Sequence, residues 1–287
     1  MESIRKATVA GSFYDSDKAS LLNQLKYCFL HEIGPQKLPE SKKIYQNKSK
    51  IKGIVSPHAG FIFSGPIAAH NYYYLSFEKI PQTIIIIGPN HRGLGEEISI
   101  MPAGYWNTPL GSIEIDEKTV KKILANDKKN IIKEDIQAHV FEHSIEVQLP
   151  FLQFIYPNNT FKIIPICITN QKLSLMKYLA DTIFGSIENT DCLFIASSDF
   201  THYESQSNAK RKDISAIEKI INMDSDAFYE NIKTNSASIC GYGPIAIVME
   251  ICKKNGIEKG ELLKYATSGD VYGMNEQVVG YASIIFR

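Results

Sequence analysis

Histidines follow three apolar runs of the sequence at similar distances. His58 follows IVS in IVSPHAG, His91 follows IIIIG in IIIIGPNH, and Asp199 and His202 follow FIASS in FIASSDFTHY. In open α/β sheets, ligands bind outside the carboxyl ends of the strands, where the loops converge. Clustered histidines and carboxylates are the usual composition of metal sites and acid/base sites. We therefore expect these four side chains to meet in one pocket, the alternative for each histidine being a loop residue bonded to a neighbouring carbonyl.

Two further segments carry reactive side chains for the same pocket. His143 lies in EHSIEVQLP, and Cys240 lies in SICGYGPIAIVMEICKK, directly before a predicted helix with Pro244 at its first position. A helix N-terminus favours the thiolate, the form of cysteine that ligates metals or attacks electrophiles. The alternative for Cys240 is a small buried hydrophobic residue.

Residues 139–143 read HVFEH and match H-x-x-E-H, the inverted zincin peptidase pattern. On one helix, His139 and His143 would share a face. The long apolar-periodic segment begins only after Ser144, which we expect to cap it, so His139 and Glu142 are predicted to precede that helix. Because a short motif has a high false-positive rate, peptidase activity is kept only as an alternative.

Four apolar runs predict the strands that position these residues: KGIVS at 52–56, TIIIIG at 83–88, FKIIPICI at 161–168 and CLFIAS at 192–197. They are apolar throughout rather than alternating, as in strands covered by helices on both faces. GPIAAHNYYYLSF, SIEVQLPFLQFI and KLSLMKYLADTIF predict crossover helices, and QVVGYASIIFR predicts a final strand. The predicted fold class is α/β, with a central, largely parallel sheet flanked by helices.

The N-terminal part predicts a helix and a loop. Ser16 and Asp17 are placed to cap a helix beginning near residues 15–18, and residues 34–52, rich in Lys, Pro, Ser and Asn, predict an exposed loop. The apolar face of this helix consists of Leu21, Leu22, Leu25, Phe29 and Leu30. No composition shift marks a domain linker, so we expect residues 1–287 to form a single domain.

Composition excludes several functional classes. The 31 basic residues balance 31 acidic ones, so no net field favours nucleic acid as a partner. The five cysteines are far apart and form no C-x-x-C pair, which favours a reducing compartment. The N-terminus lacks the apolar segment of a signal peptide, and no stretch approaches the roughly 20 apolar residues of a membrane span. We expect a cytoplasmic protein that does not enter a membrane.

Motifs along almost the whole chain resemble the Memo family. They occur in the family's order and are VAGSFYD, PHAGFIFSGPIAAH, GPNH, WNTPLGSIEID, EHSIEVQLPFLQ, SSDFTHY and ICGYGPI. The family includes animal proteins of receptor-driven cell motility and microbial proteins known as AmmeMemoRadiSam system protein B. Its fold resembles class III extradiol dioxygenases, which open catechol rings with non-haem iron. The resemblance agrees with the sheet predicted from the apolar runs.

The resemblance implies a metal site and its ligands. The family's metal-site residues correspond to His58 in PHAG, His91 in GPNH and Cys240 in ICG, while Asp199, His202 and His143 line the same pocket as catalytic candidates. The related dioxygenases use two histidines and a carboxylate. A thiol in place of the carboxylate makes the set softer, which suits iron or copper and argues against ring-cleaving activity.

Three functional readings follow. The first is a metal-dependent oxidoreductase that uses iron or copper on a small or aromatic substrate, with His202, oriented by Asp199, moving protons. The second is a non-catalytic protein that binds a metal or peptide at a vestigial dioxygenase-like site. The third is a hydrolase with Cys240 as nucleophile and a histidine as base. The microbial resemblance further implies functional association with radical S-adenosylmethionine and AMMECR-type proteins.

Overall fold

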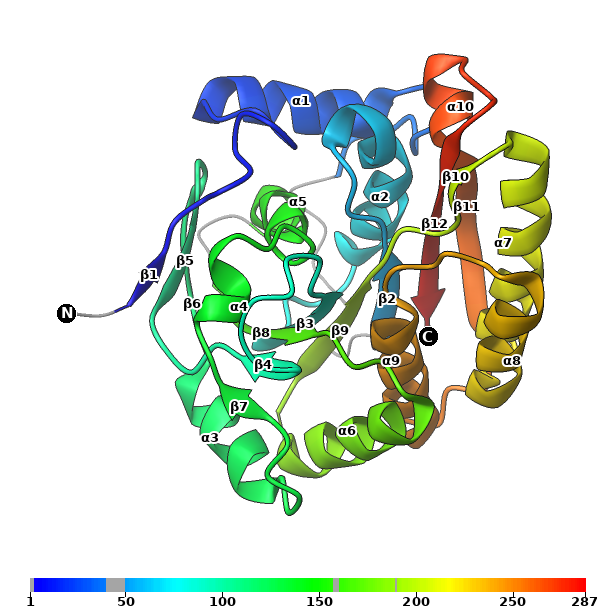
Figure 1. Cartoon of the computed structure of the whole chain (residues 1–287). Coiled ribbons are helices and arrows are strands. Elements are labelled where there is room, and N and C mark those ends of the chain that lie inside the picture. Colours follow the sequence, from blue (N-terminus) through cyan, green and yellow to red (C-terminus); the bar gives the residue numbers. More distant parts are fainter. Residues whose placement is uncertain (1–2, 40–49, 157–159, 189) are drawn as a thin grey trace.

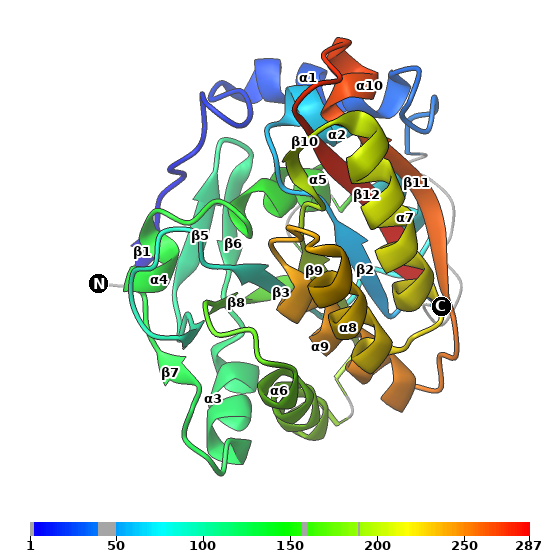
Figure 2. The same ribbon diagram turned by 45° about the vertical axis from the view of Figure 1, so that its right-hand side comes forward.

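The computed structural model describes residues 3–39, 50–156, 160–188 and 190–287 of the chain. Residues 40–49, part of the loop predicted at 34–52, lie outside the described residues. The described ends of that loop, 34–39 and 50–52, form turns and irregular backbone, as predicted. One α/β domain results, in which helices flank a central sheet (Figures 1 and 2).

The four predicted apolar strands form the centre of the main sheet. They are β2 (Gly53–Ser56), β3 (Thr83–Pro89), β8 (Lys162–Ile168) and β9 (Cys192–Ser197). Strand β9 pairs in parallel with β2 and β3, and β3 pairs in parallel with β8. The carboxyl ends of all four strands therefore lie at the same edge of the sheet, which confirms the parallel arrangement expected from the sequence.

The outer strands make the sheet mixed rather than purely parallel. They are β4 (Ile98–Ile100), β7 (Lys133–Glu134), β10 (His202–Glu204), β11 (Gly260–Thr267) and β12 (Val278–Phe286). In the described part of the chain, the order is β10-β12-β2-β9-β3-β8-β4-β7, with β11 also paired to β12. Strand β12, the predicted final strand, is antiparallel to β2, and β4 is antiparallel to β8. Of these outer strands, only β12 was predicted.

Helices cover both faces of this sheet. Around β2 and β12, one face packs against α2 (Phe61–Leu75), which in turn contacts α1 (Lys18–Leu30) and α5 (Leu149–Ile155). The other face packs against α9 (Tyr242–Lys254), which contacts α6 (Leu173–Ser186). In Figure 1 these two groups lie above and below the central strands. Because both faces are covered, the central strands are apolar along their whole length.

The remaining elements lie around this core. They are α3 (Glu117–Asn126), α4 (Gln137–Val140), the 3-10 helix η1 (Glu146–Gln148), α7 (Gln206–Ile221), α8 (Ser225–Asn235) and α10 (Ser268–Tyr272). A small separate sheet, also not predicted, consists of β1 (Ile4–Arg5), β5 (Tyr105–Thr108) and β6 (Gly111–Glu114). In the described ranges, none of the helices combines the length and apolar character that crossing a membrane requires.

One helix start matches the sequence and two differ. Asp17 caps α1, its carboxylate accepting from the backbone N–H groups of Ala19 and Ser20. Helix α2 begins at Phe61, four residues before the predicted GPIAAH segment, because the preceding FIFS residues continue the same helix. Helix α9 begins at Tyr242, so Pro244 is its third residue rather than its first. That position still lies in the first turn, where backbone N–H groups have no intrahelical partner.

Candidate functional site

The histidine pocket is a cavity of about 590 Å³ at the carboxyl ends of β2, β3 and β9. The structure brings the four strand-end residues together in this cavity and adds His143 to them. Its lining consists of Phe13, His58, Ala59, Gly60, Phe63, His91, His143, Asp199, His202, Tyr203, Ser268, Tyr272, Met274, Gln277, Val279 and Tyr281. The shared edge of the parallel strands thus positions the polar residues, while α2, α10 and β12 supply an apolar and aromatic wall.

Three of the histidines form a compact group. One ring nitrogen from each of His58, His91 and His143 lies within 4.8 Å of the other two. The rings of His91 and His143 stack with centroids 4.6 Å apart, and the His58 ring stands edge-on to both. The geometry therefore groups His143, predicted as a catalytic residue, with the two histidines predicted as metal ligands.

Glu142 holds two of these histidines from behind. Its carboxylate accepts from Nδ1 of His91 at 2.9 Å, lies 3.3 Å from Nδ1 of His143, and accepts the backbone N–H groups of His91, His143 and Ser144. Burial opposes ionisation, but the hydrogen bond from His91 and the nearby histidines lower the pKa of Glu142 to about 2. A buried carboxylate behind an imidazole fixes the ring orientation and increases its basicity as a ligand.

His58 is the most buried of the three histidines. Its Nδ1 lies 2.9 Å from Oγ of Ser197, and its backbone N–H donates to Asp199 at 2.7 Å. Burial, together with the nearby His91 and His143, lowers the pKa of His58 well below its usual value. Burial likewise lowers the pKa of His143 to about 4. Both rings are therefore neutral at physiological pH, the state in which imidazole ligates a metal.

Cys240 contacts His58 but does not join the compact group. Its Sγ lies 3.2 Å from Nε2 of His58 and accepts the backbone N–H of Asp199, also at 3.2 Å. Burial, together with the nearby Asp199 carboxylate, raises the pKa of the Cys240 thiol, which is opposite to the direction expected from its place before the N-terminus of α9. Removing the sulfur from water disfavours the charged thiolate.

His202 is oriented by a different residue from the one expected. Its Nδ1 lies 2.8 Å from the backbone carbonyl oxygen of Ser238, and its backbone N–H donates to Oγ of the same serine. Among the contacts of the described residues, Asp199 bonds to His58 and Cys240 rather than to His202. Because a carbonyl only accepts, Nδ1 of His202 donates this bond, and in the neutral form of the ring the lone pair lies on Nε2.

The HVFEH segment divides between the core and the site. His139, in the short helix α4, is fully buried with Nδ1 3.4 Å from Sγ of Cys167, whereas His143 lines the pocket and Glu142 lies buried behind it. The two histidines therefore do not form the paired face that a zincin needs. The expectation that Ser144 caps the following helix was wrong, because its hydroxyl donates to the carbonyl of Pro89. Gly88 leaves room for that contact, since a Cβ there would overlap the Ser144 side chain.

Sequence reasoning missed Phe13, Glu142 and Ser238. The ring of Phe13 lies 4.5 Å from that of His143, so the N-terminal VAGSFYD segment forms part of the pocket wall. Its inclusion among the family-like motifs was the available signal. Glu142 appeared in the sequence only within HVFEH, the match to the inverted zincin peptidase pattern, and no sequence pattern distinguishes Ser238.

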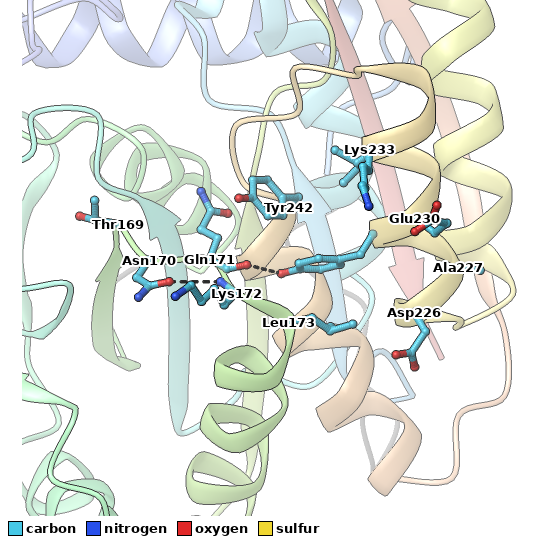
Figure 3. A pocket seen from close by; sticks show the side chains of 12 residues that line it. Thr169, Asn170, Gln171, Lys172, Leu173, Asp226, Ala227, Glu230, Lys233 and Tyr242 are labelled. Atoms are coloured by element: carbon cyan, nitrogen blue, oxygen red, sulfur yellow. Dashed lines mark hydrogen bonds between the residues drawn. The ribbon is translucent and has the colours of Figure 1, made fainter.

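A larger cavity, about 1000 Å³, lies elsewhere, between the loop from β8 to α6 and helix α8 (Figure 3). Its lining includes Lys172, Lys233, Asp226 and Glu230, and within the part of the chain that the structure describes no candidate group of metal ligands falls there. Gln171 connects this cavity to the site, because its side chain donates to the carbonyl of Cys240. Chemistry rather than size therefore identifies the histidine pocket as the candidate site.

Comparison with known proteins gives consistent relatives. A family model described as Memo-like protein matches residues 5–285. A MEMO1 family protein of Methanopyrus kandleri is 44% identical over 285 residues, covering 99% of each chain. MEMO1 family proteins of Saccharolobus islandicus and Saccharolobus solfataricus are 44% and 43% identical over 286 residues, covering 98% of this chain and 99% of each relative.

A solved structure shares the fold. The crystal structure of an uncharacterized protein of Escherichia coli K12 has a TM-score of 0.55 and 12% sequence identity, covering 83% of this chain and all of that one. At this identity the similarity concerns the fold alone.

Proposed function

Because the chain belongs to the Memo-like protein family, and because its pocket gathers three histidines, we propose that it binds iron or copper and acts as a metal-dependent oxidoreductase. The proposed substrate is a small, uncharged aromatic molecule. The observation that carries the proposal is the group of His58, His91 and His143, with ring nitrogens within 4.8 Å of one another.

The donor set fits a transition-metal ion. Three nitrogens bound about 2.1 Å from one ion lie roughly 3.0–3.6 Å apart. The three histidine nitrogens already lie within 4.8 Å of one another, so side-chain shifts on the order of 1 Å would bring them to that separation. Nδ1 of His91 is held by the Glu142 carboxylate, which leaves its Nε2 as the ligand atom. Neutral imidazoles suit copper, iron and zinc.

Cys240 is the proposed fourth donor. Its sulfur lies 3.2 Å from Nε2 of His58, which is the separation of two ligands on one ion, and binding would release the thiol proton. A softer set of three histidines and one thiolate favours copper or iron over magnesium or calcium. A bound iron or copper ion supplies one-electron chemistry to the pocket.

His202 is the proposed proton carrier, and the pocket wall selects the substrate. His202 lines the pocket, and because Ser238 holds its Nδ1, the neutral ring carries its lone pair on Nε2. Among the described residues that line the pocket, none is lysine or arginine, whereas Phe13, Phe63 and Tyr272 are aromatic. A wall of this composition favours an uncharged aromatic ring over a phosphate or carboxylate.

Metal analysis of purified variants tests the site. We expect the parent to retain iron or copper after anaerobic purification, and His58→Ala, His91→Ala, His143→Ala and Cys240→Ala each to lose tight binding while staying folded. His202→Ala should keep the metal but lower turnover of a panel of phenols and catechols. The matched control is His70→Ala. His70 lies on α2, its ring bonds to the Ile33 carbonyl, and it does not line the pocket. Full metal content in all four ligand variants would refute the site.

A non-catalytic binding role is the second candidate. Tyr203, Tyr272 and Met274 line the pocket with 74%, 54% and 70% of their surface exposed, an arrangement that favours contact with a larger apolar ligand such as a peptide. Turnover of any member of the substrate panel by the metal-loaded protein, lost in His202→Ala, would exclude this role. Metal binding without turnover would favour it.

A further inference from the structure

Behind His58, away from the pocket, lies a series of buried polar side chains joined by hydrogen bonds. Nδ1 of His58 meets Oγ of Ser197, which also contacts Nε2 of Gln148 at 2.9 Å and the carbonyl oxygen of Ser144 at 2.5 Å. Gln148 in turn accepts from the hydroxyl of Tyr72 at 2.5 Å. His58, Ser197, Gln148 and Tyr72 are all fully or almost fully buried, so they are shielded from water and bond to one another and to nearby backbone carbonyls.

The direction of each hydrogen bond in this series follows from its carbonyl groups. Nε2 of Gln148 lies 3.0 Å from the carbonyl oxygen of Pro57. Since a carbonyl only accepts, that position must be the amide nitrogen, which then also donates to Ser197. The single hydroxyl proton of Ser197 goes to the carbonyl of Ser144, because two oxygens 2.5 Å apart need a proton between them.

The proton of His58 is then determined. Oγ of Ser197 has given its proton to Ser144 and can only accept from its other neighbours. Nδ1 of His58 must therefore carry the ring proton and donate it, which leaves the lone pair on Nε2, the atom that faces Cys240. Without Ser197, the competing tautomer would place the proton on Nε2, where it would donate to the Cys240 sulfur instead of leaving a lone pair for a ligand.

We propose that Ser197 is a positioning residue that holds His58 in the Nδ1-protonated tautomer and so prepares its Nε2 to bind the metal. The part of the inference that concerns metal binding rests on the proposed function, whereas the part that concerns the tautomer does not. It also assigns a common role to residues 142–148. Glu142 orients His91 and His143, while the Ser144 carbonyl and Gln148 orient His58 through Ser197. One segment thus prepares all three histidines.

The first test is the tautomer of the metal-free protein, measured by ¹⁵N NMR of the histidine rings. In the parent, we expect Nδ1 of His58 to be the protonated nitrogen. Ser197→Ala should raise the Nε2-protonated population, and Ser197→Cys, which keeps a weak donor and acceptor, should fall between the two. The control is Ser186→Ala, which also deletes a buried hydroxyl bonded to a carbonyl, that of Thr182, but is remote from the histidines. An unchanged His58 tautomer in folded Ser197→Ala would overturn the proposal.

The second test is metal affinity. Loss of a group that orients a histidine ligand typically costs ~10-fold to 100-fold in affinity, so Ser197→Ala should bind copper(I) or iron(II) weaker by that factor, and Ser186→Ala should bind like the parent. Parent-like affinity in Ser197→Ala would refute the role of Ser197. If the parent itself binds neither ion, the proposed function fails, and the NMR result alone decides whether Ser197 sets the tautomer.

Discussion

Two buried carboxyl groups, Glu142 and Asp213, have pKa values shifted in opposite directions because they receive different numbers of hydrogen bonds. Glu142 receives an imidazole N–H and three backbone N–H groups, which keep its pKa low. Asp213, on α7, receives one backbone N–H, from Thr201, and the hydroxyl of Tyr265, and here burial prevails and raises the pKa. The balance between desolvation and the number of donors therefore decides which carboxyl is easily ionised.

Asp213 is predicted to make stability depend on pH. A carboxyl with a raised pKa in the folded protein stabilises the fold below its unfolded pKa, and this contribution is lost as pH rises through the folded pKa. Asp213→Asn keeps the shape and removes the charge, so its free energy of unfolding relative to the parent should increase from pH 4 toward neutrality. Urea denaturation across that range measures the difference. Asp226→Asn, at an exposed site on α8, is the control, and a pH-independent difference for Asp213→Asn would contradict the prediction.

Single site residues could be predicted from the sequence only where they directly follow a recognisable strand. His58, His91, Asp199 and His202 follow strands, and parallel strands bring such residues to one edge. Glu142 could not be assigned, because its role depends on the distance from a loop 51 residues away in the chain, at His91. The ring of His202 bonds to a backbone carbonyl, which any residue at position 238 would offer, and only the bond from its backbone N–H depends on the Ser238 hydroxyl.

At the scale of elements, the strands with a clear hydrophobic pattern were predicted and those without one were missed. Strands β2, β3, β8 and β9 are buried on both faces, and their continuous apolar runs identified them. Strands β1, β4, β7 and β10 have two or three residues each, too few to show a period. Strand β11 is longer but mostly half-buried along both faces, so its sequence GELLKYAT does not alternate.

The loop from β8 to α6 is predicted to hold the Cys240 turn in place. The Gln171 side chain donates to the carbonyl of Cys240 at 2.9 Å and accepts the backbone N–H of Gly243 at 2.6 Å, and Figure 3 shows it beside Tyr242. Gln171→Ala removes both bonds, which should lower the free energy of unfolding by ~1–3 kcal/mol. The freed turn should also expose the Cys240 sulfur, so its alkylation by iodoacetamide should accelerate.

Peptide mapping of the metal-free protein separates Cys240 from the other cysteines, which are buried. The control is Lys172→Ala, an exposed neighbour on the same loop with no side-chain bond to the Cys240 turn among the described residues. Equal alkylation rates in the parent and Gln171→Ala would show that the turn keeps its position without Gln171.

At the scale of the whole molecule, the N-terminal segment is joined to the site by one buried ion pair. Arg5 pairs with Glu146, and both side chains are almost fully buried. Glu146 also accepts from the backbone N–H groups of Thr8 and Val9 and from the hydroxyl of Tyr14. The pair therefore fastens residues 5–14, including the pocket-wall Phe13, to the segment that carries Glu142 and His143.

Breaking this pair from one side should destabilise the protein strongly. Arg5→Met leaves the Glu146 charge buried without its partner, which typically costs ~3–5 kcal/mol. Removing both charges in Arg5→Met with Glu146→Gln should cost less than the sum of the two single changes, because neither charge is then left unpaired. Urea denaturation of the four proteins in the cycle gives the coupling energy. Fluorescence of the single tryptophan, Trp106, whose ring lies under Arg5, should change in Arg5→Met before global unfolding.

The matched control for this cycle is the pair of Lys162 and Glu114, which links β8 to β6 with both side chains nearly half exposed. Exposed pairs typically couple by only ~0–1 kcal/mol, since water screens both charges and solvates whichever remains. Lys162→Met with Glu114→Gln should therefore be close to additive, whereas the Arg5 and Glu146 cycle should not. If the buried pair proved as additive as the exposed one, the N-terminal segment would be held by its other hydrogen bonds, such as that from the Tyr14 hydroxyl to Glu146, and by its aromatic contacts. The ion pair would then have no part in placing Phe13 against His143.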